Sequence, residues 1–181
     1  GEVLDTKHTT PESADLQKLL AYMAERGVEV VAMEVSSHGL YQGRSLGCEF
    51  DCGVFTNIAR DHLDFHKTIE AYLDAKIILF RDHPKASAKQ FHAVINADDP
   101  SAGKVREAAQ GRIITFGMNS GADVTASDVD LTDKSVSFTM NHGGRGVPVR
   151  LGIGGAFNVY NALSAAGAAI ALGMDLATIA S

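Results

Sequence analysis

The stretch TIEAYLDAKIILFRDHPKASAKQFHAVINADDPSAGKVREAAQGRIITF, residues Thr68–Phe116, decides the fold class. Its first part predicts a helix over Thr68–Phe80, capped by its first residue, and then a strand over His92–Ala97. A second helix, Ala102–Ala109, and a second strand, Arg112–Phe116, follow. Strands that alternate with helices in this way form parallel sheets with helices on both faces. The stretch therefore predicts an α/β fold.

The residues before this stretch add one helix and two strands. Thr10 and Pro11 are typical of a helix start, with threonine as the N-cap and proline at the first helical position, and Gly27 ends the helix. The near-continuous apolar run Val28–Val35 predicts a strand buried on both faces. Asp51–Asn57 predicts a second buried strand, and the polar RDHLDFH after it predicts a loop. Because ligands of parallel sheets bind where strands end, the residues after these strands are the first site candidates.

The last third of the chain has a different pattern. From residue 124 to 153, short alternating segments are separated by turn sequences, which predicts an antiparallel meander. An alanine-rich helix over Asn158–Leu172 follows and ends at Gly173. The predicted fold is therefore a mostly parallel sheet flanked by helices, with an appended antiparallel meander.

Composition excludes several classes of partner. With 181 residues, 45% of them hydrophobic, the chain suits one globular domain. A net charge of −6 without a lysine or arginine cluster argues against nucleic acid and anionic membranes, and no apolar run predicts membrane insertion. Two cysteines, Cys48 and Cys52, indicate reduced thiols in a cytoplasmic protein. The alternative is a zinc site that they share with His62 and His66.

The string MEVSSHGLYQGR, Met33–Arg44, places several reactive groups at the end of a predicted strand. Glu34 lies within an apolar run, where an unpaired carboxylate is costly and a bound cation or basic partner would relieve the cost. The alternative is a glutamate that points to solvent. Ser36, Ser37 and His38 also allow a hydrolase hypothesis, but the G-x-S-x-G elbow is absent and no acidic partner is indicated.

The string TNIARDHLDFH, residues 56–66, is a second candidate site. Asp61, His62, Asp64 and His66 could bind a metal, and this mixture of oxygen and imidazole ligands favours Mg²⁺ or Mn²⁺ over Zn²⁺. The alternative is a polar loop whose side chains form turn hydrogen bonds.

Lys76 lies on the apolar face of the predicted helix Thr68–Phe80. Its neighbours at helical spacing are Tyr72, Leu73, Leu79 and Phe80. Burial lowers the pKa of a lysine, and a neutral amine can take up carbon dioxide to form a carbamate, which is a metal ligand. The alternative is a lysine whose long side chain reaches water.

The string GIGGAFNVYN, Gly152–Asn161, joins a predicted strand to a helix. Such a glycine-rich junction can hold phosphate, but Phe157 stands where the last glycine of G-x-G-x-x-G belongs. A tight strand-to-helix turn is the alternative.

Together, MEVSSHGLYQGR, FTNIARDHLDFH, AYLDAKIILF, VINADDP and GAFNVYNALSAA resemble, in this order, the central domain of MurE-type Mur ligases. The resemblance runs from about Thr9 to Gly173. It implies a cytoplasmic bacterial enzyme of peptidoglycan synthesis that uses ATP and Mg²⁺ to join an amino acid to UDP-N-acetylmuramoyl-L-alanyl-D-glutamate through an acyl phosphate.

The resemblance also implies roles for individual residues. The implied substrate-binding residues are Thr9, Thr10, Ser36, Gln42 and Arg44. The implied nucleotide-binding residues are Asn57 and Asn158. The implied metal ligands, which are also the implied catalytic residues, are Glu34, His62 and Lys76 as its carbamate.

One departure from the family concerns the phosphate-binding loop of the G-x-x-x-x-G-K-[ST] kind, which the sequence lacks. We expect residues 1–181 to be a central domain truncated at its start, without the loop, the uridine-binding N-terminal domain and the amino-acid-binding C-terminal domain, and inactive alone. Three alternatives are a catalytically silent binding or regulatory domain, a ligase like folylpolyglutamate synthetase and a metal-dependent hydrolase.

Overall fold

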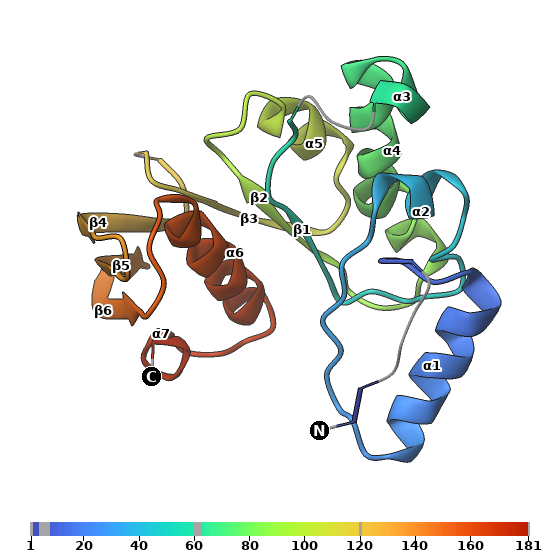
Figure 1. Ribbon diagram of the computed structural model, residues 1–181, viewed down its shortest axis with the longest axis horizontal. Helices are drawn as coiled ribbons and strands as arrows, with labels where there is room; N and C mark the ends of the chain where they lie inside the picture. The colour runs from blue at the N-terminus through green and yellow to red at the C-terminus, as the bar shows by residue number, and fades with distance from the viewer. Residues whose placement is uncertain (1, 4–7, 60–62, 120, 181) are drawn as a thin grey trace.

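The computed structural model of the chain (Figure 1) describes residues 2–3, 8–59, 63–119 and 121–180. Its centre is a six-stranded sheet in which the strands are neighbours in the order of the sequence. The strands are β1 (Cys52–Phe55), β2 (His92–Asn96), β3 (Arg112–Gly117), β4 (Val124–Leu131), β5 (Val136–His142) and β6 (Arg145–Leu151). Pairing is parallel from β1 to β4 and antiparallel from β4 to β6. The prediction of a parallel sheet with an appended meander is confirmed.

Helices cover both faces of the sheet, as predicted. They are α1 (Ser13–Glu25), α2 (Ser37–Tyr41), α3 (Leu63–His66), α4 (Ile69–Arg81), α5 (Ala102–Ala108), α6 (Phe157–Ala171) and α7 (Leu176–Ile179), with a 3₁₀ turn at Pro84–Ala86. Alternation along β2 sorts its side chains, because successive residues of a strand point to opposite faces. Ala93 and Ile95 pack in one core with residues of α4 and α5, whereas Val94 packs in the other with residues of α6.

Helix α4 has the N-cap and the buried apolar face that its sequence predicts. The side chain of Thr68 accepts a hydrogen bond from the backbone N–H of Ala71 at 3.1 Å, which satisfies one of the free donors at the helix start. Leu73, Ile77 and Phe80 then bury one face of the helix in the core beneath β1 and β2. The packing of α4 against the sheet therefore fixes the position of Lys76.

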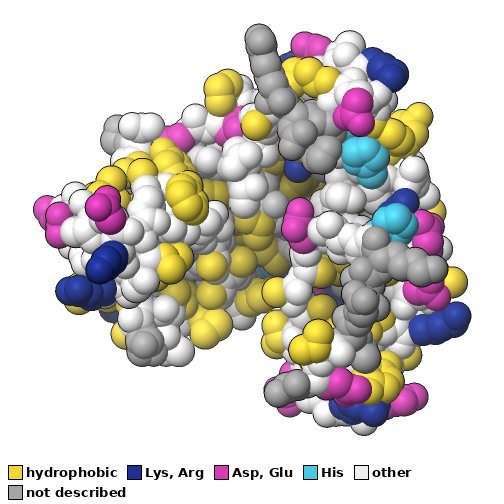
Figure 2. Space-filling model, viewed as in Figure 1, with side chains coloured by type: hydrophobic (Ala, Val, Ile, Leu, Met, Phe, Trp, Pro, Cys, Tyr) yellow, Lys and Arg dark blue, Asp and Glu magenta, His cyan; other side chains and the backbone are white. Residues whose placement is uncertain are grey.

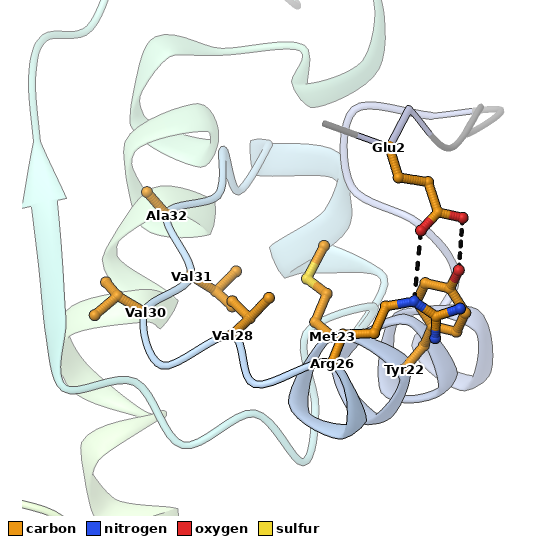
Figure 3. A pocket seen from close by; sticks show the side chains of 8 residues that line it. All are labelled: Glu2, Tyr22, Met23, Arg26, Val28, Val30, Val31 and Ala32. Atoms are coloured by element: carbon orange, nitrogen blue, oxygen red, sulfur yellow. Dashed lines mark hydrogen bonds and ion pairs between the residues drawn. The ribbon is translucent and has the colours of Figure 1, made fainter.

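The prediction of a strand over Val28–Val35 was wrong. Residues 28–36 form neither helix nor strand, and the side chain of Val30 is 77% exposed. Figure 3 shows Val28, Val30 and Val31 along a cavity of about 360 Å³ beside α1, and Figure 2 shows hydrophobic side chains around the hollow at the centre of this face. An apolar run becomes a strand when another strand pairs with it, and no described strand pairs with this one.

Two other local predictions need correction. Helix α1 begins at Ser13 rather than after Thr10, with Glu12 at the N-cap position and no side-chain cap bond, because the hydroxyl of Thr10 bonds to the distant Ser36 instead. The predicted loop RDHLDFH contains the helical turn α3 within its described part. The predicted end of α1 at Gly27 is confirmed, since this glycine has a φ of 76° that side chains disfavour. Within the described residues, no helix is both long and apolar enough to cross a membrane.

Candidate ligand-binding and active site

A pocket of about 250 Å³ opens where β1, β2 and β3 end. Side chains that follow these strands and side chains of α6 line it: Thr56, Asn57, Asn96, Phe116, Phe157, Tyr160 and Asn161. The lining combines aromatic rings with carboxamides, and none of these seven side chains carries a charge. Such a lining suits a planar, neutral ring with hydrogen-bonding edges better than it suits a phosphate.

The two predicted nucleotide-binding residues have different positions at this pocket. Asn57 lines it directly and is exposed. Asn158 is buried behind it, where its side-chain amide donates to the carbonyl of Gly154 at 2.7 Å and its oxygen accepts from Asn161 at 3.3 Å. Asn158 therefore closes the strand-to-helix turn and holds a lining residue, which agrees with the tight-turn alternative for GIGGAFNVYN.

Residues of the VINADDP string brace the pocket, and sequence reasoning gave them no role. The amide of Asn96 donates to the carbonyl of Thr56 at 2.7 Å, which joins the ends of β1 and β2. The carboxylate of Asp98 accepts from the Tyr160 hydroxyl at 2.9 Å and from the backbone N–H of Met118 at 2.7 Å. Burial alone would raise the pKa of Asp98, but these bonds and those from Asn119 outweigh it and lower that pKa.

Three of the predicted substrate-binding residues lie close together at the start of α2. Thr10 is 1% exposed, and its hydroxyl accepts a hydrogen bond from the backbone N–H of Ser36 at 2.9 Å. Arg44 donates from Nη1 to the carbonyl of Thr10 at 3.1 Å. The hydroxyl of Ser36 caps α2 by accepting from the N–H of Gly39 at 3.0 Å. The structure thus brings these residues together from separate parts of the chain.

Arg44 has a second partner that the sequence analysis missed. Its Nε lies 3.2 Å from the Glu12 carboxylate, within ion-pair distance but without hydrogen-bond geometry, and its side chain is 14% exposed. These contacts with Thr10 and Glu12 therefore hold the Arg44 guanidinium in place. Thr9 and Gln42, the remaining predicted substrate contacts, are exposed at the margin of this group.

Lys76 lies on α4 among buried side chains, as its helical spacing predicted. Tyr72, Leu73, Leu79 and Phe80 are all buried, and Lys76 Nζ lies 5.2 Å from the centre of the Tyr72 ring. Burial lowers the pKa of Lys76, and the negative charge of Glu34 partly opposes that effect. The amine is therefore nearer to its neutral, reactive form than that of a surface lysine.

Glu34 is exposed, so its carboxylate does not carry the cost of burial that the apolar run predicted. Its influence on the pKa of Lys76 nevertheless places the two charges in the same region. Asp61 and His62 lie outside the described residues. Among the residues that are described, no three His, Cys, Asp or Glu side chains group closely enough to hold a metal.

The geometry gives little support to the hydrolase hypothesis or to a zinc site that includes the two cysteines. Ser37 is 2% exposed and hydrogen-bonded to His66 at 2.9 Å, so it is not accessible as a nucleophile. The same bond occupies His66 Nε2, so this nitrogen is already engaged within the protein. Burial raises the pKa of Cys48, although the hydrogen bond that its sulfur accepts from the Gln17 amide at 3.4 Å opposes this effect. Burial also raises the pKa of Cys52 to about 11, so neither thiol is a ready thiolate ligand.

Comparison with known proteins identifies the family. Residues 1–169 match the family described as the Mur ligase middle domain. The chain belongs to this family. Two curated relatives named UDP-N-acetylmuramoyl-L-alanyl-D-glutamate--2,6-diaminopimelate ligase are 39% identical (Bacillus licheniformis) and 44% identical (Geobacillus kaustophilus). The matches cover 98% and 96% of this chain but 37% and 36% of those relatives.

Solved structures agree with this assignment. A structure of a ligase of the same name matches with a TM-score of 0.86 and 35% identity, over 96% of this chain and 36% of that one. MurF from Acinetobacter baumannii matches with a TM-score of 0.65 and 28% identity, over 73% of this chain and 28% of that one. A folylpolyglutamate synthetase variant from L. casei shares the fold alone, with a TM-score of 0.63 and 17% identity over 88% of this chain and 43% of that one.

The Mur ligase middle domain described here therefore has two groups of candidate site residues. One group surrounds α2 and α4 and contains Thr10, Ser36, Arg44 and Lys76. The other is the uncharged pocket beside α6. The larger cavity beside α1 contains none of the residues that the sequence analysis selected.

Proposed function

We propose that this Mur ligase middle domain binds ATP and UDP-N-acetylmuramoyl-L-alanyl-D-glutamate as part of a cytoplasmic bacterial ligase that adds an amino acid to that substrate. The observation that carries the proposal is the hydrogen-bonded unit of Thr10, Ser36 and Arg44 at the start of α2, which packs against α4, the helix of Lys76. It supplies a cationic donor, Arg44, whose side chain is only 14% exposed. The relatives' names specify 2,6-diaminopimelate as the amino acid.

The proposed reaction is the activation of a carboxylate followed by amide formation. A carboxylate oxygen of the muramoyl dipeptide attacks the γ-phosphorus of ATP, and ADP leaves. The amine of the amino acid then attacks the carbonyl carbon of the acyl phosphate, loses a proton, and phosphate leaves. Phosphoryl transfer between anions depends mainly on positioning and charge neutralisation rather than on a protein nucleophile.

Each described residue has a defined task in this proposal. Arg44 would donate to an anionic group of the muramoyl dipeptide, from a position fixed by Thr10 and Glu12. Thr9, Ser36 and Gln42 would add polar contacts around it. Asn57 and the turn that Asn158 closes would hold the nucleotide at the uncharged pocket.

The proposed ligands fit Mg²⁺ if Lys76 carries a carbamate. Glu34 and a Lys76 carbamate would supply oxygen ligands, and His62, outside the described residues, would supply an imidazole. An unmodified lysine cannot serve, but the lowered pKa of Lys76 favours the neutral amine that carbamate formation requires. When bound, Mg²⁺ would neutralise phosphate charge.

Ligand binding to the ¹⁵N-labelled chain tests the proposal. Titration with the UDP-muramoyl dipeptide should shift the amide signals of Thr10, Ser36 and Arg44, and titration with Mg-ATP should shift those of Asn57 and Asn161. Arg44→Met should abolish the first response and keep the second. Arg26→Met is the matched control, because it removes an exposed arginine beside the other cavity. A muramoyl-dipeptide response that Arg44→Met and Arg26→Met leave equally intact would overturn the assignment.

Carbamate formation is tested separately with ¹³C-labelled bicarbonate. The chain should show a carbamate carbon signal by NMR that Lys76→Met removes. Lys18→Met, at an exposed lysine, is the matched control and should keep the signal. A spectrum without a signal that depends on Lys76, even with Mg²⁺ and both substrates present, would exclude this ligand.

A further inference from the structure

A column of buried side chains connects the loop that carries Ser36 to Lys76. It starts at Ser37, the first residue of α2, which is 2% exposed and follows Ser36 directly. His66, at the end of α3, is 7% exposed, and its Nε2 lies 2.9 Å from the Ser37 hydroxyl. The imidazole of His66 stacks on the ring of Tyr72, with 5.4 Å between ring centres and 19° between planes. Three elements, α2, α3 and α4, thus meet in one column.

The Tyr72 ring is the part of the column that reaches the amine. Tyr72 precedes Lys76 by one helical turn, and the two side chains therefore share one face of α4. The ring is 6% exposed and lies beneath Lys76 Nζ at 5.2 Å from its centre. An aromatic face attracts a cation, whereas the ring edge repels it, so the tilt of Tyr72 decides what the amine meets.

The tilt of Tyr72 in turn depends on His66. An imidazole stacked nearly parallel to the phenol ring leaves that ring little freedom to tilt, and the hydrogen bond to Ser37 fixes the imidazole about its own axis. His38 and Phe65 pack against His66 with ring centres 5.3 Å and 4.8 Å away. The imidazole is thus held by a hydrogen bond in one direction and by rings in others.

We infer that His66, held by Ser37, is a positioning residue that sets the plane of Tyr72 and through it the position of the Lys76 amine. The importance of that position for catalysis rests on the proposed function; the positioning itself does not. The inference gives a task to two buried side chains, Ser37 and His66, that the proposed chemistry leaves unused. It also couples the loop that carries Ser36 to the helix that carries Lys76.

The ring current of Tyr72 supplies a direct measurement. Protons above the face of an aromatic ring resonate upfield, so the side-chain CH₂ signals of Lys76 should lie upfield of those of the exposed Lys18 in ¹³C-lysine-labelled chain. His66→Ala should remove most of that upfield displacement. His66→Phe, which keeps an aromatic ring for stacking, should retain most of it, and Ser37→Ala should give an intermediate value. Tyr72→Leu defines the signal with no ring current.

The matched control is a second buried serine–histidine pair. Ser45 and His83 lie 3.0 Å apart at the other end of α4, so Ser45→Ala removes the same kind of bond without touching the column. It should leave the Lys76 signals unchanged. Wild-type Lys76 signals in His66→Ala would overturn the inference. If His66→Ala does not fold, Ser37→Ala decides: a reduced displacement supports the inference and an unchanged one overturns it. Because no ligand is present, failure here is distinct from failure of the ligase proposal.

Discussion

The two ends of α4 each have a buried serine–histidine pair, but the pairs lie in different surroundings. At the N-terminal end, His66 bonds to Ser37 and stacks on Tyr72, which lies beneath Lys76. At the C-terminal end, His83 bonds to Ser45 and meets Phe50 edge to face, with ring centres 5.2 Å apart. The bond is the same at both ends. The comparison shows that such a pair gains a chemical role from what its histidine contacts next.

The largest expected effect is at the C-terminal end, where we expect a purely structural role. Phe80 is 2% exposed and packs edge to face with Phe55 and Phe91. Phe80→Ala should lower the free energy of unfolding by about 3–5 kcal/mol, because it leaves a cavity in the core. Urea unfolding followed by circular dichroism measures the loss. A loss below about 1 kcal/mol would mean that this end of α4 is less well packed than described.

Removing the hydroxyl of either pair should have a smaller effect on stability. Ser45→Ala leaves the buried Nε2 of His83 without its partner and should cost about 1–3 kcal/mol. Ser37→Ala should cost a similar amount for the same reason. Urea unfolding of both variants, together with the Lys76 NMR signals, sharpens the comparison, since the two should differ in the NMR signals and not in stability. A Lys76 shift in Ser45→Ala would contradict it.

The pH dependence of stability should report on His83. Burial lowers its pKa below the ordinary value of 6.5, although a backbone hydrogen bond involving Cys48 and the charge of Asp82 oppose this. The unfolded chain therefore binds the proton first, and the folded state loses stability as pH falls below about 6.5 until the folded pKa is passed. Urea midpoints between pH 8 and pH 4 should show this loss, and His83→Phe should reduce it. An identical pH profile in His83→Phe would assign the loss to other groups.

The smallest stability effect is expected at Lys76. Lys76→Met removes a partly buried amine but keeps a flexible apolar side chain of similar length, so the loss of the contact with Tyr72 and the relief of burying a charge oppose each other. Because these two effects oppose each other, stability should change by no more than about 0.5 kcal/mol. Thermal unfolding measures it. A larger loss would show that Lys76 has a structural role in addition to the proposed chemical one.

Most of the fold follows from local patterns. Thr68 caps α4 as its sequence predicts, and the strands β1 to β6 occur where alternation or continuous apolar runs predict them. Val28–Val35 has an equally apolar pattern and is not a strand, because a strand depends on a paired neighbour that its own sequence does not specify. Local patterns therefore predict which segments can become strands, while pairing decides which of them do.

The candidate site was less predictable than the fold. The apolar surroundings of Lys76 follow from helical spacing within one segment. The contacts of Arg44 with Thr10 and Glu12, and of His66 with Ser37, join residues far apart in the chain, and no local pattern indicates them. The resemblance to the family selected Thr10 and Arg44 but gave no reason to select Glu12 or Ser37. Long-range side-chain contacts thus needed the structure.

The consecutive order of the strands places the pairings that are closest in sequence at one end of the sheet. The meander pairs residues that are close in sequence, such as His142 with Arg145, whereas β1 and β2 pair Cys52 with the distant His92. Because the entropy lost in closing a loop grows with its length, the hairpins from β4 to β6 have the smallest barrier to formation. The short step from Phe116 to Val124 then adds β3 to an edge that is already in place. The strand pair β1 and β2, which borders the candidate pocket, therefore depends most on contacts between residues that are distant in sequence.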